Sequence, residues 1–182
     1  MGDPKKKRRK YTTPKVPYNT EVLMSELKLL GSYGLRNKRE LWRIRTLLSI
    51  IRRRARDQLS LPITEREMSE KALITKLSKQ GLMSPNGRLE DVLRLSVEDL
   101  LERRLQTITF RKGLAKSLYQ ARQLISHGHI SIKGRKVKSP SYNVEIDDEP
   151  SIEYTQSSPY SNKDHPLRKE MATYLAAGGT RD

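Results

Sequence analysis

The sequence predicts an α+β fold: a helical N-terminal region, then a small domain in which two helices pack on a short, mainly antiparallel sheet. Between residues 20 and 112, apolar residues recur at the spacing of helices that bury one face. After Gly113, one further helical stretch gives way to alternating apolar and polar residues, the pattern of half-buried strands. Two separate blocks of positive charge support a division into two parts.

The composition restricts the class of protein. The chain has 182 residues, and its hydrophobic fraction of 35% is low for a self-sufficient core, so we expect part of its order to depend on a partner. A net charge of +16 favours RNA, DNA or an anionic membrane as that partner. The absence of cysteine excludes disulfides, thiol catalysis and thiolate zinc sites. No apolar run suits a membrane span or a signal peptide, so we expect a soluble intracellular protein.

The first elements are an arm and two helices. The basic run that starts at Lys5 cannot bury apolar area, and we expect an extended arm that binds phosphate rather than a nuclear-import signal. A helix should begin at Asn19 or Thr20 and end at Gly31, and a second should begin at Asn37. Their apolar stripes are Leu23, Leu27 and Leu30, then Leu41, Ile44, Leu48, Ile51 and Ala55.

Three further helical segments are predicted before Gly113. A capping box at Thr64 opens one that ends at Gly81, and a turn at Pro85 leads to a short apolar segment over residues 89–95. Ser96 should cap the next helix. The apolar stripe of that helix is Val97, Leu101, Leu105 and Ile108.

The C-terminal half should combine one helix with short strands. Ser117 caps a helix that Gly128 ends, and residues 130–138 form a hairpin around Lys133, Gly134 and Arg135. Tyr142, Val144 and Ile146 alternate as a further strand, residues 147–150 form an acidic loop, and residues 151–154 a final strand. The predicted division is a basic arm 1–18, a helical region 19–96, a small α+β domain 97–154, and a tail 155–182 with a short helix after Asp164.

The second helix carries the first candidate binding surface. Seven arginines lie between residues 39 and 56, and only Glu40 and Asp57 could balance them. A charged helix face is usually just solvated, but arginine suits bidentate phosphate contact, and we predict RNA phosphates here. Trp42 is expected to pack rather than stack on a base. The candidates are Lys5, Lys6, Lys7, Arg8, Arg9, Lys10, Arg36, Lys38, Arg39, Arg43, Arg45, Arg52, Arg53, Arg54 and Arg56.

The second candidate surface spans residues 103–138, which hold ten Lys or Arg and no Asp or Glu. Such a stretch repels itself unless a polyanion lies against it, and the helix start near Ser117 adds free N–H groups. The candidates are Arg103, Arg104, Lys116, Ser117, Gln120, Arg122, Gln123, His127, Lys133, Arg135, Lys136 and Lys138. Because Arg104 lies among leucines, it is also expected to brace the helix pair.

These residues resemble a known family. The stretch from Arg104 through Ala121-Arg122-Gln123-Leu124-Ile125 and His127-Gly128-His129-Ile130 to Pro140 and Ser141 is similar to the RNA-binding domain of ribosomal small-subunit protein four (S-four). Residues 36–43 and 101–107 resemble the archaeal and eukaryotic branch, and the resemblance covers nearly the whole chain. The chain lacks the cysteine zinc motif that bacterial members can carry and the long basic C-terminal extension of eukaryotic ones, which favours the archaeal type.

The resemblance implies a primary binder of 16S-type rRNA that nucleates small-subunit assembly. It further implies a place near the channel through which messenger RNA enters, and a contribution to translational accuracy. Expected partners are small-subunit rRNA, neighbouring small-subunit ribosomal proteins and messenger RNA at that channel, with no homo-oligomer. The expected location is the cytoplasmic ribosome. Residues 19–96 would then be a helical rRNA-binding region, and residues 97–154 an S-four-like domain.

Three other classes fit less well. A metal site at His127 and His129 lacks a third ligand, so we expect neither a metal nor a cofactor. Residues 87–91 superficially resemble the catalytic loop of pseudouridine synthases, but a Glu stands where that motif has Asp, and the stretch precedes the binding domain. We therefore expect a turn that opens a helix, and no enzyme. A membrane-surface protein is disfavoured because the aliphatic stripes are long enough to pack against one another.

Overall fold

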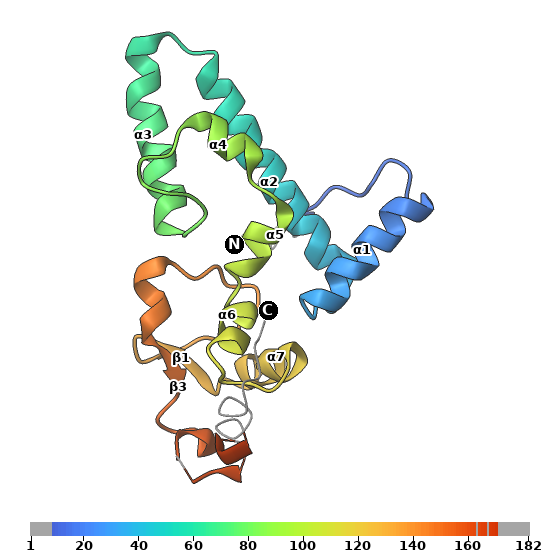
Figure 1. Ribbon diagram of the computed structural model, residues 1–182, viewed down its shortest axis with the longest axis vertical. Helices are drawn as coiled ribbons and strands as arrows, with labels where there is room; N and C mark the ends of the chain where they lie inside the picture. The colour runs from blue at the N-terminus through green and yellow to red at the C-terminus, as the bar shows by residue number, and fades with distance from the viewer. Residues whose placement is uncertain (1–8, 163, 167, 171–182) are drawn as a thin grey trace, which may run out of the picture.

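The computed structural model describes residues 9–162, 164–166 and 168–170 and contains helices followed by short strands, of which β3 (Ile152–Tyr154) alternates between buried and exposed residues whereas β1 (Ile130–Ile132) is buried throughout. The molecule is elongated, with α2, α3 and α4 at one end and α6, α7 and the sheet at the other (Figure 1). Its α-helices are α1 Thr20–Ser32, α2 Lys38–Leu59, α3 Ile63–Lys79, α4 Leu89–Arg94, α5 Val97–Glu102, α6 Leu105–Arg111 and α7 Leu118–Ser126. Its strands and 3-10 helices are β1 Ile130–Ile132, β2 Arg135–Lys136, η1 Ile146–Ser151, β3 Ile152–Tyr154 and η2 Pro159–Ser161. The predicted α+β class is confirmed.

Side-chain caps fix where several helices begin. Asn19 accepts a hydrogen bond from the N–H of Glu21 at 3.0 Å, which caps α1. Asn37 caps α2 by accepting from the N–H of Glu40, and Ser96 and Ser117 cap α5 and α7. These four predicted caps are confirmed. Among the described helices, none is both long enough and apolar enough to cross a bilayer.

The long helix α2 organises the helical end of the molecule. Its predicted stripe is confirmed, because Leu41, Leu48, Ile51 and Ala55 are buried. On α1 the prediction was partly wrong: Leu27 is exposed, whereas Glu26 is buried against α2. The buried core between α2, α3, α4 and α5 consists of Leu48, Ile51, Ala55, Leu73, Leu77, Leu89, Val92, Leu95 and Leu100.

Two predicted helix boundaries were wrong. Helix α3 begins at Ile63 with Pro62 at the N-cap position and no side-chain cap, so Thr64 lies inside the first turn rather than before it. The helix predicted from Val97 through Ile108 is broken at Arg104, whose backbone is extended (φ −74°, ψ 141°). The break has a tertiary cause, because the N–H of Leu105 donates to the carbonyl of Tyr142 at 2.8 Å instead of continuing α5.

A three-stranded antiparallel sheet with the order β2-β1-β3 forms the other end of the molecule. Lys133 and Gly134 both have positive φ (48° and 75°) in the two-residue connection between β1 and β2, which is the geometry of a type I′ turn. The sheet, α6 and α7 enclose a core of Leu105, Ile108, Ala115, Ala121, Leu124, Ile125, Ile130, Ile132, Val144, Ile152 and Tyr154.

The strand predicted at Tyr142, Val144 and Ile146 was wrong. Only one bridge forms there, between Arg104 and Asn143, and the acidic loop that follows is the 3-10 helix η1. The backbone of Val144 instead pairs with the α5–α6 link: its N–H donates to the Arg103 carbonyl at 2.9 Å, and its carbonyl accepts from the Arg103 guanidinium at 3.1 Å. The predicted tail helix after residue 164 is described only in part, at residues 166 and 168–170.

Candidate nucleic-acid interface

Helix α2 presents the first cationic surface. Arg39, Arg43, Arg54 and Arg56 are exposed, and the described residues provide no ion pair for any of them. Arg53 is also exposed and has one weak partner, Asp57, at 3.8 Å. Five arginines on one helix therefore keep their hydrogen-bond donors available for an anion.

Three other predicted cations of this region hold the protein together instead. Arg45 donates to the buried carboxylate of Glu26 at 2.5 Å, and Lys38 lies 3.5 Å from the same carboxylate. Glu26 also accepts from the Trp42 indole N–H at 3.1 Å, so Trp42 packs as predicted. Arg52 donates to the backbone carbonyl of Leu95 at 2.5 Å. These side chains fix α1 and the α4–α5 link to α2.

The basic arm reaches the described part of the chain at Arg9 and Lys10, and both are exposed. The Arg9 guanidinium lies over the ring of Tyr11, 4.5 Å from its centroid. Arg36 is exposed between α1 and α2. The other predicted cations of the arm, Lys5, Lys6, Lys7 and Arg8, lie outside the described residues.

The second cationic surface is formed by α7 and the β1–β2 hairpin. Arg135, Lys136 and Lys138 are exposed, and no ion pair to another described residue is present for them. Lys133, at the turn, pairs with Asp148, whose hydrogen bond and charge raise the lysine pKa. On α7, Gln123 is exposed, and His127 is exposed just after the helix ends.

The start of α7 is partly occupied by its own side chains. The Ser117 hydroxyl accepts from the N–H of Gln120 at 3.2 Å, and the Gln120 side chain accepts from the N–H of Lys116 at 2.6 Å. Lys116 is exposed and pairs with Glu170. A phosphate at this helix start would replace or share these bonds rather than meet free N–H groups.

Glu40 joins the two ends of the molecule through a buried ion network. From the first turn of α2 its carboxylate accepts from Arg122 on α7 at 2.5 and 3.1 Å and from Arg104 at 3.0 Å. The Arg104 side chain is only 3% exposed, so the structure assigns it to the interior. Burial alone would raise the pKa of Glu40, but the hydrogen bonds and charges of the two arginines hold it below its usual value.

Gln106 completes this junction. Its side-chain N–H donates to the carbonyls of Gly34 at 2.9 Å and Leu118 at 3.0 Å, which ties the end of α1 to α7. Gly34 has φ +56°, and a Cβ there would lie 2.7 Å from the Cβ of Leu118. The helical end is thus joined to the small domain by these polar contacts and one close approach, in addition to the apolar cluster of Leu35, Leu41 and Leu101.

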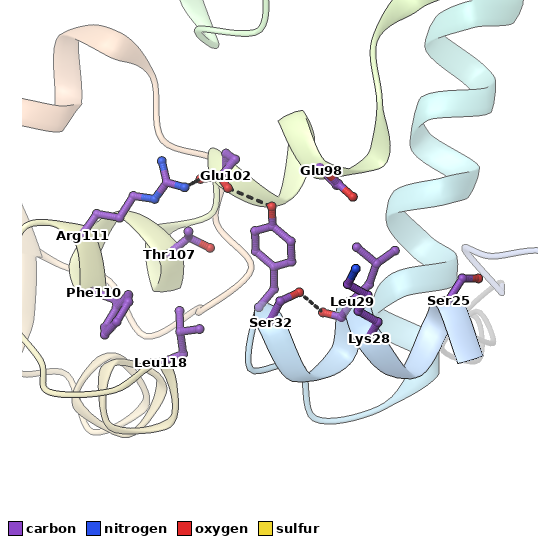
Figure 2. A pocket seen from close by; sticks show the side chains of 11 residues that line it. Ser25, Lys28, Leu29, Ser32, Glu98, Glu102, Thr107, Phe110, Arg111 and Leu118 are labelled. Atoms are coloured by element: carbon purple, nitrogen blue, oxygen red, sulfur yellow. Dashed lines mark hydrogen bonds and ion pairs between the residues drawn. The ribbon is translucent and has the colours of Figure 1, made fainter. Parts of the chain in front are cut away.

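Arg103 makes an ion pair within the small domain, and a pocket lies close to it. Arg103 donates to Glu149 at 2.9 Å. A pocket of about 490 Å³ lies between α1, α5 and α6, where Arg111 points at Glu102 (Figure 2). The Tyr33 hydroxyl donates to Glu102 at 2.8 Å. Burial raises the pKa of Tyr33, and this hydrogen bond adds to the effect. The pocket holds acids as well as cations and adds nothing to the two cationic surfaces.

His129 has a packing role. Its Nδ1 lies 3.0 Å from the Ser158 hydroxyl, and its ring meets Tyr160 edge-on, which anchors the chain after β3. Burial lowers the pKa of His129, and the charges of His127 and Lys136 add to this effect. Within the described ranges, no three His, Cys, Asp or Glu side chains gather as a metal site.

Sequence reasoning missed three exposed features next to the cations. Tyr119 is exposed on α7, and Leu47 and Ile50 are exposed on α2. The signal for the α2 pair was present, because Leu47 and Ile50 fall outside the stripe that includes Leu48 and Ile51. The charge pattern alone gives no reason to single them out.

The comparisons with known proteins agree with this geometry. The S4 domain family matches residues 103–150, which contain α6, α7 and the β1–β2 hairpin. Small ribosomal subunit protein uS4 of Hyperthermus butylicus is 53% identical to the chain over 163 residues, covering 90% of the chain and 93% of that protein. The chain belongs to the uS4 family.

Further relatives support the same assignment. The uS4 protein of Ignicoccus hospitalis is 54% identical, with 90% of this chain and 98% of that protein covered. That of Metallosphaera sedula is 52% identical, with 89% and 91% covered. The chain is thus a uS4 protein of archaeal type, which confirms the resemblance seen in the sequence, and it is not an enzyme.

Proposed function

We propose that this chain is a primary binder of small-subunit rRNA whose two cationic surfaces hold one folded rRNA junction. Membership of the uS4 family makes it a structural protein of the small ribosomal subunit, and its location is the cytoplasmic ribosome. Nucleation of subunit assembly, a place near the channel where messenger RNA enters, and a contribution to translational accuracy belong to the same proposal. We also propose that its partners include neighbouring small-subunit proteins and messenger RNA, and that the free protein is a monomer.

The observation that carries the proposal is the unequal fate of the cations. Those near the centre of the molecule pair with Glu26 or Glu40. Most exposed cations of α2 and of the hairpin have no ion pair among the described residues; the exceptions are Arg53, with Asp57 at 3.8 Å, and Lys133, with Asp148. A protein that needed its charge only for solubility would intersperse acids among these side chains. Clustered cations with few acids beside them suit a polyanion such as the RNA backbone.

A cleft of about 230 Å³ lies between α2 and the small domain. One wall comes from α2, with Arg43 and Leu47, and the other from the small domain, with Pro140, Ser141 and Asn143. Because the Glu40 network fixes both walls, the free protein presents them at a set angle. We propose that the arm 1–18, the helical region 19–96 and the domain 97–154 act on one RNA, with the tail 155–182 outside this interface.

The test neutralises three cations at a time and measures both the affinity for a 16S-type 5′-domain rRNA fragment and its salt dependence. The α2 variant carries Arg53→Gln, Arg54→Gln and Arg56→Gln. The hairpin variant carries Arg135→Gln, Lys136→Gln and Lys138→Gln. The matched control carries Lys71→Gln, Lys76→Gln and Lys79→Gln, which are exposed on α3 outside both surfaces.

Each surface variant should weaken binding and reduce the slope of log K against log[salt] by roughly two to three, about 0.9 for each phosphate that is no longer neutralised. The control should keep the slope of the unaltered protein. If all three variants lost affinity equally, binding would be non-specific attraction. If only the hairpin variant lost affinity, the α2 surface would not take part.

A further inference from the structure

Helix α2 exposes two large apolar side chains among its arginines. Leu47 is 39% exposed and Ile50 is 45% exposed, and they lie one turn apart on one face. They line a cavity of about 520 Å³ together with the basic arm. Exposed apolar side chains that lie side by side, next to arginines without a described ion pair, form a candidate binding patch.

The arm forms the opposite wall of this cavity. The N–H of Thr12 donates to the Thr46 hydroxyl on α2 at 3.1 Å, which holds the arm against the helix. Tyr11 packs on Trp42 with ring centroids 5.9 Å apart, and the Arg9 guanidinium lies over the Tyr11 ring, 4.5 Å from its centroid. The cavity therefore has one aliphatic wall and one wall that is aromatic and cationic.

The lining selects the chemistry of an occupant. Arg9, Lys10 and Arg43 are cationic, and none of the lining residues is acidic. An occupant must therefore carry negative charge next to a flat or apolar body. A nucleotide has this combination, because its base can lie on apolar or aromatic side chains while its phosphate binds arginine.

We propose that this cavity takes one unstacked nucleobase of the rRNA, with the base on Leu47 and Ile50 and the adjoining phosphate on Arg43. The inference rests on the proposed function and names a base-binding site within it. Arg43 and Leu47 also line the cleft between α2 and the small domain, so the cavity lies next to the proposed path of the RNA. The competing occupant is an acidic, apolar segment of a neighbouring protein. The position of the cavity beside the proposed RNA path does not favour such a segment.

The test separates apolar from electrostatic contact. Leu47→Ser with Ile50→Ser removes apolar surface but no charge, so affinity for the rRNA fragment should fall roughly 5- to 30-fold while the salt slope stays unchanged. Arg43→Gln should instead reduce the slope by about one. The matched control, Met24→Ser with Met68→Ser, removes two exposed apolar side chains from α1 and α3 and should stay within about twofold of the unaltered protein.

An abasic scan of the RNA completes the test. At one unpaired position, loss of the base should weaken binding by the unaltered protein and have little further effect on the Leu47→Ser, Ile50→Ser variant. Equal binding by variant and unaltered protein would overturn the base site and leave the proposed function intact. Failure of the unaltered protein to bind the rRNA would overturn the proposed function itself. If the variant bound RNA normally but failed to recruit a neighbouring protein to reconstituted subunits, the cavity would belong to that protein and not to a base.

Discussion

Removal of the Glu40 carboxylate should strongly destabilise the free protein. Glu40 is 15% exposed and is the acceptor for two guanidinium groups, one of which, on Arg104, is only 3% exposed. In the Glu40→Ala variant Arg104 would keep its charge without a partner or access to water. Removal of one partner of a buried ion pair costs about 3–5 kcal/mol. Arg122, at 22% exposure, can turn toward solvent, so we expect a loss near the lower limit, about 3 kcal/mol.

Thermal unfolding followed by circular dichroism measures this effect. A loss of that size should lower the melting temperature by roughly 6–12 °C in a protein of this length. The control, Asp57→Ala, removes a partner of the exposed Arg53 pair and should cost less than about 1 kcal/mol. If Glu40→Ala melted at the same temperature as Asp57→Ala, the network would not hold the two ends of the molecule together.

The same network predicts a pH dependence. The pKa of Glu40 is lowered from 4.5 in the folded protein, so its unfolded state binds a proton more readily. Its stabilising contribution is therefore complete above about pH 4.5 and is lost as the pH falls through the lower folded-state pKa. The difference in melting temperature between the unaltered protein and Glu40→Gln should shrink over that acidic range. A difference independent of pH would contradict an ionised Glu40.

Two glycine substitutions distinguish backbone strain from helix propensity. Gly34→Ala places a Cβ at φ +56° and 2.7 Å from the Cβ of Leu118, so we expect about 2–3 kcal/mol of destabilisation, measured by urea unfolding. Gly31→Ala lies in the last turn of α1 with no atom within 4 Å of the added Cβ, and it should leave stability unchanged or raise it by up to about 1 kcal/mol. Equal effects of the two changes would contradict the described close approach.

Local chemistry made much of the fold predictable. The Asn37 side chain caps α2 by accepting from the N–H of Glu40, only three residues further along the chain. The turn at Gly134, where φ is positive, likewise depends on its immediate neighbours. The break at Arg104 could not be predicted in this way, because its cause is the carbonyl of Tyr142, far along the chain. Helical periodicity continues through the break, so the sequence pattern carries no sign of it.

The candidate site was predictable in position but not in detail. The period of α2 placed Arg54 and Arg56 outside the apolar stripe, and both are exposed. Helical periodicity could not predict that Arg45 pairs with Glu26. Nor could it predict that Arg122 pairs with Glu40, because the two residues are 82 positions apart in the sequence. Which cations remain available for RNA depends on these distant acids, and only the tertiary structure shows where they lie.

The salt dependence of rRNA binding by the unaltered protein tests the central claim most directly. If the two cationic surfaces neutralise on the order of ten phosphates, log K should fall with log[salt] with a slope of roughly seven to nine in magnitude. We predict a slope in that range for a 5′-domain rRNA fragment. A slope near zero would contradict the claim that the unpaired cations of this uS4 protein are there to hold an RNA backbone.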